Sequence, residues 1–129
     1  IGGTIPKYTA LDGRCIDGCR DLNLVSGVSE KKVMEVTEHN NTFQGYKVTL
    51  FSANSGKLKN ASSQIPYTAK YAGAPVSLLA AGSIVTNQGA QLTPVNATKD
   101  LKISIGANPA ASSMAGYYTD TLTFVITAN

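Results

Sequence analysis

The stretch that decides the fold is G-Y-Y-T-D-T-L-T-F-V-I-T-A-N, from Gly116 to Asn129. Apolar and hydroxyl-bearing residues alternate in it, so that Leu122, Phe124 and Ile126 fall on one side of an extended chain. A period of two with apolar residues on one face is typical of a half-buried strand. Such a strand needs a second layer over its apolar face and a hydrogen-bonding neighbour at each edge. No further strand follows in this sequence, which raises the question of what lies beside it.

Short runs of strand-forming residues, separated by turn signals, continue toward the N-terminus. We expect strands at 46–51, 65–71 and 101–105, a less regular one at 32–37 and a shorter one over 21–28. The segment 75–85 is short and flanked by glycine, so we expect a strand, a turn and a second strand there. Abundant Ser and Thr between regular turns predict an all-β sandwich. With 129 residues and 43% hydrophobic content, residues 1–129 are expected to form one domain.

Composition argues against two classes of partner. The net charge is only +3 and the charges are scattered, with Lys31-Lys32 the sole adjacent basic pair. A nucleic-acid surface would need a dense basic stripe with aromatic residues between the charges, so no nucleic-acid partner is predicted. No apolar run approaches the roughly 20 residues that span a bilayer, so no membrane insertion is predicted.

Catalytic groups are few. Glu35 and Glu38 fall on opposite faces of a strand and do not form a carboxylate pair. The one histidine, His39, stands beside Asn40-Asn41 and is expected to be structural or solvated, because a functional histidine needs partners within reach. No serine lies in a nucleophile-elbow pattern and no phosphate loop is present. We therefore predict no enzyme and no cofactor.

The two cysteines stand in C-I-D-G-C, at Cys15 and Cys19. Asp17-Gly18 between them indicates a turn, which brings the two Cα atoms into bridging range and favours a disulfide. The alternative is a pair of metal ligands, which is weaker because no second cysteine pair exists and His39 is distant in sequence. A disulfide would place the maturation of the protein in an oxidising compartment.

The C-terminal stretch closely resembles the last strand of bacterial chaperone–usher pilus subunits, which end in an alternating G-x-Y-x-D-x-L pattern. The stretch 45–58, G-Y-K-V-T-L-F-S-A-N-S-G-K-L, resembles a second family motif, and 65–73, I-P-Y-T-A-K-Y-A-G, resembles the strand that follows it. The opening G-T-I-P at 3–6 resembles the start of the pilin body. The chain is also similar to the related spore coat U-type domains.

This resemblance implies an immunoglobulin-like β-sandwich that lacks its last strand and is completed by a donor strand from another polypeptide. Strand addition of this kind gains affinity from main-chain hydrogen bonds and from alternate side chains that enter pockets. The implied function is a structural subunit of a bacterial surface pilus, assembled by donor-strand exchange and supporting adhesion or biofilm formation. The implied partners are a periplasmic chaperone, an outer-membrane usher and neighbouring subunits, and the implied location is the periplasm and then the cell surface.

The resemblance also assigns residues. Leu122, Phe124 and Ile126 would line one wall of the donor-strand groove, and the first strand, with Ile5 and Tyr8, would line the other. The terminal carboxylate on Asn129 would be gripped by basic residues of the chaperone.

Two features leave alternatives open. Relatives usually carry a longer alternating extension before the body, whereas only Ile1-Gly2-Gly3-Thr4 precedes Ile5-Pro6 here. A chain with this start is expected to accept a strand but not to donate one, unless the extension lies outside this chain or was removed. The same sandwich would also suit a ligand-binding tip adhesin, although few aromatic residues are present to stack on sugars, or a spore or envelope coat protein.

Overall fold

A computed structural model of the chain describes residues 1–16 and 18–129. The predicted turn at Asp17-Gly18 therefore lies partly outside the described residues. The described part contains a short 3-10 helix, η1 (Ala110–Ser112), and the following strands: β1 (Thr9–Cys15), β2 (Val28–Asn40), β3 (Tyr46–Ser52), β4 (Lys57–Asn60), β5 (Ser63–Pro66), β6 (Thr68–Tyr71), β7 (Ala74–Val76), β8 (Ser83–Gln88), β9 (Val95–Ile105) and β10 (Leu122–Ala128).

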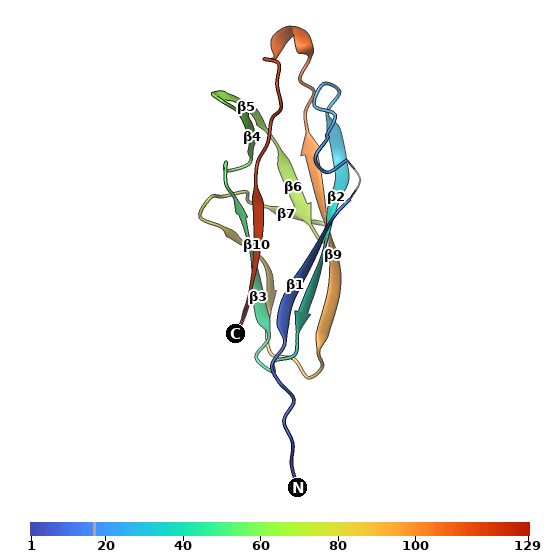
Figure 1. Cartoon of the computed structure of the whole chain (residues 1–129), viewed down its shortest axis with the longest axis vertical. Coiled ribbons are helices and arrows are strands. Elements are labelled where there is room, and N and C mark those ends of the chain that lie inside the picture. Colours follow the sequence, from blue (N-terminus) through green and yellow to red (C-terminus); the bar gives the residue numbers. More distant parts are fainter. Residues whose placement is uncertain (17) are drawn as a thin grey trace.

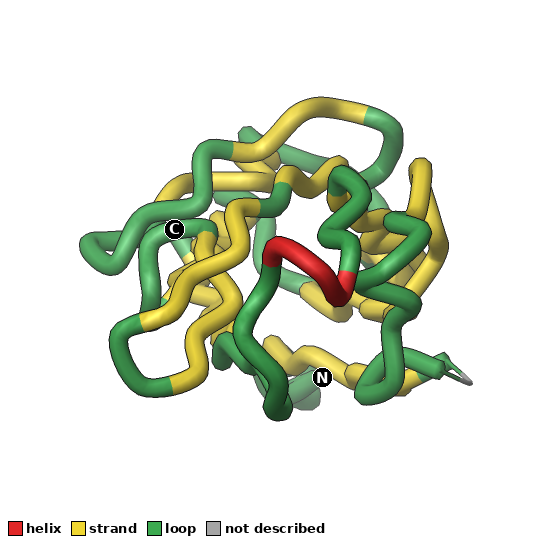
Figure 2. The backbone as a smooth tube through the Cα atoms, turned by 90° about the horizontal axis from the view of Figure 1, so that it is seen from above, coloured by secondary structure: helices red, strands yellow, loops and turns green. Residues whose placement is uncertain are grey.

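The strands form two main antiparallel sheets. The first has the order β1-β2-β9-β6-β7 and the second the order β10-β3-β8, while β4 and β5 make a separate hairpin. The molecule is elongated along the strands (Figure 1), and the view from above shows the strands arranged around a shared interior (Figure 2). The predicted all-β sandwich is thus confirmed.

Most of the predicted strands are present. The runs at 46–51 and 101–105 lie in β3 and β9, the run at 32–37 lies in the longer β2, and 75–85 forms the predicted strand, turn and strand. The strand predicted over 21–28 is wrong, because 21–27 is a loop. Its leucines still pack on the core, and the Asn108 amide donates to the carbonyl of Leu24, which fixes the loop without a ladder.

The run predicted as one strand at 65–71 is divided between two elements. The chain leaves the β4–β5 hairpin at Pro66 and joins the first sheet at Thr68. Between them, the Tyr67 amide donates to the carbonyl of Gly56 at 3.0 Å. Every second residue stays buried where the chain passes from β5 to β6, at Ile65, Tyr67 and Ala69. The sequence pattern therefore did not reveal the break between the two strands.

The two sheets enclose a core in which the period of two is regular. In β3, Tyr46, Val48 and Leu50 are buried and alternate with more exposed residues. The first sheet contributes Val36, Leu101, Ile103 and Ile105 to the interior. Aliphatic burial of this kind contributes roughly 25 cal/mol per Å² of apolar surface removed from water.

A carboxylate lies inside this apolar core. Glu38 points inward from β2 and is 0% exposed. Its oxygens accept hydrogen bonds from the hydroxyls of Tyr46 at 2.7 Å, Tyr71 at 2.5 Å and Thr86 at 2.7 Å. The ammonium of Lys99 lies 2.9 Å from Oε1. Glu38, Tyr71 and Lys99 belong to the first sheet and Tyr46 and Thr86 to the second, so the cluster joins the two layers.

The hydrogen bonds decide the charge of Glu38. Burial by itself would raise the pKa of the carboxyl, but the bonds from Tyr71, Lys99, Thr86 and Tyr46 together lower the pKa below its ordinary value. Burial and then the bond to Glu38 raise the pKa of Tyr46 and of Tyr71, so both phenols remain donors. Glu38 is therefore a carboxylate at neutral pH, and its charge is matched by that of the partly exposed Lys99.

We predict that Glu38→Gln destabilises the fold by about 3–5 kcal/mol, because it leaves the Lys99 ammonium without its buried counter-charge. Glu35→Gln is the matched control on the opposite face of β2, where the carboxylate pairs with Arg14 and Lys32 near solvent; that change is expected to cost about 1 kcal/mol or less. Urea unfolding of the two variants measures both values. Equal losses would show that the buried cluster does not stabilise the sandwich.

Candidate functional site

One edge strand of each main sheet, β1 in the first and β10 in the second, lies next to the other. Among the described residues, β1 pairs only with β2, and β10 pairs only with β3. In Figure 1 the two strands lie side by side along the body of the molecule. Their closest Cα atoms are within 8 Å, but no ladder joins them among the described residues. We call the space between the facing edges of β1 and β10 the seam.

The hydrogen bonds at both ends of β10 show which of its backbone groups face the seam. The carbonyl of Thr121 accepts from the Ala53 amide at 3.0 Å, and the Asn129 amide donates to the carbonyl of Gly45 at 3.0 Å. Odd-numbered residues therefore direct their backbone groups toward β3. Because these directions alternate along a strand, the backbone groups of Leu122, Phe124, Ile126 and Ala128 point toward the seam.

The same reasoning applies to β1. The carbonyl of Tyr8 accepts from the Asn41 amide, and the Ile16 amide donates to the carbonyl of Val33. Even-numbered residues of β1 thus direct their backbone groups toward β2. The backbone groups of the odd-numbered residues point toward the seam; these residues are Thr9, Leu11, Gly13 and Cys15. The seam is flanked on both sides by unpaired amides and carbonyls, which is the template that another strand can pair with.

Apolar side chains lie behind these backbone groups and are only partly covered. Leu122, Phe124 and Ile126 are half-buried, whereas the residues between them are exposed. The ring of Phe124 lies 5.5 Å from that of Tyr71 in the core. The alternation predicted for this strand is therefore confirmed, and its apolar face is not fully closed.

The other wall differs from the prediction, because the first strand begins at Thr9. Ile5 precedes the strand and is 87% exposed. Tyr8 is even-numbered, like the residues of β1 whose side chains point away from the core. Its ring stacks on the ring of His39, with the two centroids 5.6 Å apart. The apolar residue that β1 turns inward is Leu11, which packs on the core. Leu11, the single large apolar residue in T-A-L-D-G-R-C, was not predicted as part of this wall, although it was the available signal.

Next along β1, Gly13 has no side chain to contribute to this wall. A Cβ at Gly13 would lie 2.6 Å from Cε of Met34, so the methionine of β2 occupies the inward position instead. The wall of the seam on this side is therefore built by Leu11 and Met34 together.

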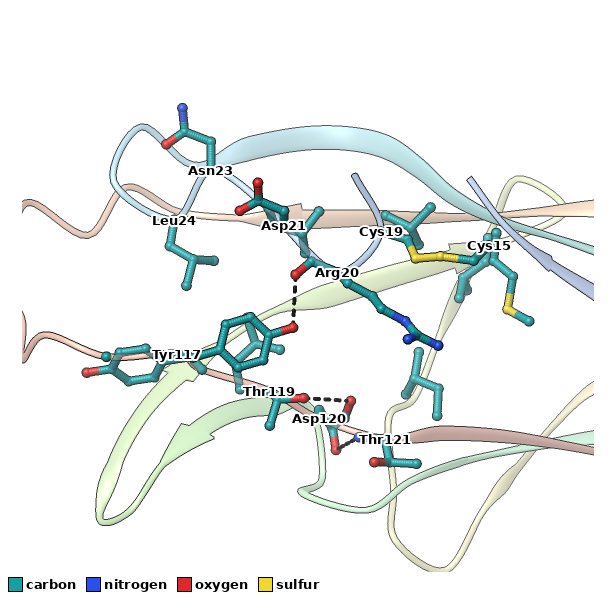
Figure 3. Close-up of a pocket in the computed structure, with 18 of the residues that line it drawn as sticks. Cys15, Cys19, Arg20, Asp21, Asn23, Leu24, Tyr117, Thr119, Asp120 and Thr121 are labelled. Atoms are coloured by element: carbon teal, nitrogen blue, oxygen red, sulfur yellow. Dashed lines mark hydrogen bonds between the residues drawn. A yellow bond between two sulfur atoms is a disulfide. The ribbon is translucent and has the colours of Figure 1, made fainter. Parts of the chain in front are cut away.

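At the end where β10 begins, the seam widens into a cavity of about 1000 Å³ (Figure 3). Two loops form it, 19–25 and 116–121, and the Tyr117 hydroxyl joins them by donating to the carbonyl of Arg20 at 2.9 Å. The Cys15–Cys19 disulfide lines the cavity, with its Cα atoms 6.0 Å apart. The disulfide interpretation of the C-I-D-G-C motif is thereby confirmed, and the described residues contain no group of three or more potential metal ligands from His, Cys, Asp and Glu.

Asp120 fixes the start of β10, a role that the sequence did not reveal. Its carboxylate accepts from the Ser52 hydroxyl at 2.6 Å, the Tyr67 hydroxyl at 2.5 Å and the amide of Asn54 at 2.9 Å. Burial and then the bond to Asp120 raise the pKa of Tyr67, so the phenol remains a donor. β10 is thus held to the β3–β4 connection and keeps its register although one edge is open.

At the opposite end of β10, Asn129 is bonded to the body. Its side-chain amide donates to the carbonyls of Gln44 at 3.1 Å and Gln88 at 3.0 Å. The residue is exposed beside the β2–β3 turn. The predicted role of its carboxylate as a chaperone anchor stays a prediction.

His39 connects β1 to the rest of its sheet. Its Nδ1 lies 2.6 Å from Oδ1 of Asn96 in β9, and its Nε2 lies 2.8 Å from Oδ2 of Asp12 in β1. Both oxygens accept hydrogen bonds, so the protonated ring, which donates from both nitrogens, fits the pair. The bonds to Asn96 and then to Asp12 raise the pKa of His39. The expectation that His39 is structural agrees with this arrangement.

No protein-family model and no curated protein matches the chain. Among solved structures, the chain is similar to the CooA pilin subunit from enterotoxigenic Escherichia coli. The two are 19% identical, with a TM-score of 0.43 over 91% of this chain and 86% of that one. Among the described residues, no helix is long and apolar enough to cross a membrane.

We predict that the contribution of His39 to stability depends on pH. The protonated ring makes both bonds, so its contribution is fully present below the unfolded-state pKa of about 6.5 and is lost as pH rises through the higher folded-state pKa. His39→Gln should therefore lower the free energy of unfolding more at pH 5 than at pH 9. Urea unfolding at the two pH values measures this, with Asp12→Asn expected to show the same trend. A loss that is equal at both values would contradict the assignment.

Proposed function

We propose that the protein is a structural subunit of a bacterial surface pilus whose seam is filled by a β-strand from another polypeptide. The single observation that carries the proposal is the pair of facing, unpaired edges backed by half-covered apolar side chains. The sequence resemblance to chaperone–usher pilus subunits supports it independently, because the motifs occur in the family's order along the chain. β1 and β10 contain no proline or lysine, and no helix of the described residues covers their facing edges, so three of the means by which proteins block an edge are not used here.

The chemistry of the seam defines the strand that fits it. Unpaired backbone groups on both sides require an extended segment that hydrogen-bonds along both of its edges. The half-buried face of β10, with Leu122, Phe124 and Ile126, requires apolar side chains at every second position of that segment. A polypeptide strand with period-two hydrophobicity meets both requirements, whereas a small molecule meets only the second.

A strand in the seam requires β1 and β10 to separate. Two strand spacings are about 9.6 Å, which exceeds the 8 Å within which the closest Cα atoms of β1 and β10 lie. Binding therefore widens the seam, and the incoming strand replaces the direct contact between the two edges. The two layers stay joined during this movement because Glu38 and its donors lie within the sandwich rather than at the seam.

We further propose that two kinds of polypeptide fill the seam in turn. During export a periplasmic chaperone covers it, the outer-membrane usher passes the subunit on, and in the fibre the segment before β1 of a neighbouring copy takes the place of the chaperone strand. The first strand begins at Thr9, so the segment before β1 includes Ile5 and Pro6 as well as the four residues that precede them. Ile1 and Ile5 share one side of this segment, whereas Gly3 between them has no side chain to enter a pocket. The resulting fibre would support adhesion or biofilm formation at the cell surface.

The test is thermal unfolding with a synthetic nine-residue peptide of alternating Thr and Val. A ligand at 100 times its Kd stabilises a protein by about 2.7 kcal/mol, which raises Tm by roughly 5–15 °C for a domain of this size. The control peptide has the same composition with its Thr and Val residues in two separate blocks, and it should leave Tm unchanged. A peptide of residues 1–8 then identifies the natural source of the strand.

Two alanine variants locate the peptide. Phe124→Ala removes an apolar contact in the seam, whereas Val125→Ala changes the neighbouring residue on the exposed face of the same strand. The Tm increase should shrink in the first variant and persist in the second. The proposal fails if the alternating peptide has no effect on the wild type, or if both variants respond as the wild type does.

A further inference from the structure

The first sheet carries a polar cluster on the face that points away from the core, where β1, β2 and β9 lie next to one another (Figure 1). His39 is at its centre, directly across from Ala10 of β1 and Asn96 of β9. Tyr8 and Asp12 lie two positions before and after Ala10. We call Tyr8, Asp12, His39 and Asn96 the outer cluster. It is separate from the seam, because its side chains point out of the sheet whereas the seam runs along the edge of β1.

Tyr8 gives this cluster a flat apolar surface that is fixed in place. Its amide donates to Oδ1 of Asn41 at 2.7 Å, and its carbonyl accepts from the Asn41 amide at 3.1 Å. One face of its ring stacks on His39, while the residue remains 52% exposed, so the opposite face of the ring is open to solvent. Because the ring is already held by its backbone and by one face, it loses little freedom when a ligand stacks on the other face.

Two polar side chains beside this ring keep unused hydrogen-bonding capacity. Asp12 bonds to His39 through Oδ2 at 2.8 Å, so its Oδ1 is available to accept, and its side chain is 74% exposed. Asn96 bonds to His39 through Oδ1 at 2.6 Å, so its Nδ2 is available to donate. Among the described residues, no hydrogen bond occupies either of these two atoms. The His39 ring therefore fixes an acceptor at one of its edges and a donor at the other.

An open aromatic face beside an acceptor and a donor matches the chemistry of a sugar ring. A pyranose has a face of C–H groups, which packs on an aromatic ring, and hydroxyls around its rim, which can both donate and accept. Ala10 has a one-carbon side chain, so the surface is low between Tyr8 and Asp12, which are roughly 13 Å apart along an extended strand. The exposed charged group of the cluster is the Asp12 carboxylate, which repels an anionic sugar. The matching ligand is therefore a neutral sugar.

We propose that the outer cluster binds a neutral hexopyranose unit of a glycan. The C–H face of the sugar packs on Tyr8, one hydroxyl donates to Oδ1 of Asp12, and a second hydroxyl accepts from Nδ2 of Asn96. The contact is small, so one sugar binds with a Kd of about 1 mM. This binding goes beyond the role of a structural subunit and does not use the seam. If copies of the chain line a fibre, many such sites together hold a glycan-covered surface far more tightly than one does.

The test is an NMR titration of the full chain, followed at the backbone amides, with the methyl glycosides of glucose, galactose and mannose. These probes differ in the orientation of single hydroxyls, so at least one of them should satisfy both polar groups. We expect that probe to bind with a Kd of about 1–10 mM, with the largest shifts at residues 8–12, 39 and 96. Two further probes should give no such shifts. Glycerol has hydroxyls but no ring face, and glucuronate adds a carboxylate that Asp12 repels.

Four variants locate the sugar. Tyr8→Ala removes the stacking face, and Asn96→Asp removes the donor while it keeps an acceptor for His39; each should weaken binding by about fivefold or more. Tyr8→Phe keeps the ring and should bind as the wild type does. Tyr117→Ala is the control, because it removes another exposed tyrosine from the loop before β10. The amide spectrum of the core residues shows whether each variant is folded.

The outcomes separate this site from the seam. The sugar site is overturned if none of the three glycosides shifts these amides at about 50 mM, if glycerol shifts them equally, or if Tyr8→Ala or Asn96→Asp binds as the wild type does. Shifts centred on the cavity at the start of β10 also contradict it. The alternating Thr-Val peptide should leave the Kd of the sugar unchanged, and competition between the two would overturn the separation of the sites. Failure of the peptide alone overturns the proposed function and leaves the sugar site standing.

Discussion

The structure depends on β10, a strand that lacks a hydrogen-bonding neighbour at one edge and cover for part of its apolar face. Its inner face carries Leu122, Phe124 and Ile126, and these apolar side chains need cover on the side away from β3. The backbone groups of the same residues point to that side and have no partner in the described chain. An extended strand with alternating apolar side chains would satisfy both, because its backbone pairs with the free edge of β10 and its side chains cover the apolar face.

A sandwich with one open seam needs other interactions to hold its layers in register. The buried cluster around Glu38 does this by joining β2, β6 and β9 of one sheet to β3 and β8 of the other. Asp120 holds the start of β10 to the β3–β4 connection, and His39 ties β1 to β2 and β9. Each of the two edge strands is therefore positioned by polar contacts that leave its seam-facing edge free. The seam can widen for a strand while the interior stays fixed.

The sequence predicted the features that repeat locally and missed those that need distant partners. The alternation at Leu122, Phe124 and Ile126 was readable because each residue lies two positions from the next. Leu11 was missed because the first strand was expected to include Ile5, whereas it begins at Thr9. Glu38 lies two positions after Val36 in β2, so the two side chains point to the same, inward face. The residues that bond to Glu38 come from other strands, and the sequence pattern does not show which strands lie opposite it. The break at Tyr67 was invisible because burial continues across it.

The measurement that tests the central claim most directly is hydrogen exchange at the amides of β10, followed residue by residue by NMR. In the isolated protein, the amides of Leu122, Phe124 and Ile126 should exchange fast, and those of Thr123, Val125 and Thr127 should be protected by β3. A bound donor strand should slow exchange at the first three and change little at the others. Equal protection of all six amides in the isolated protein would mean that β10 already has a partner on both sides, and the account of an open seam would be wrong.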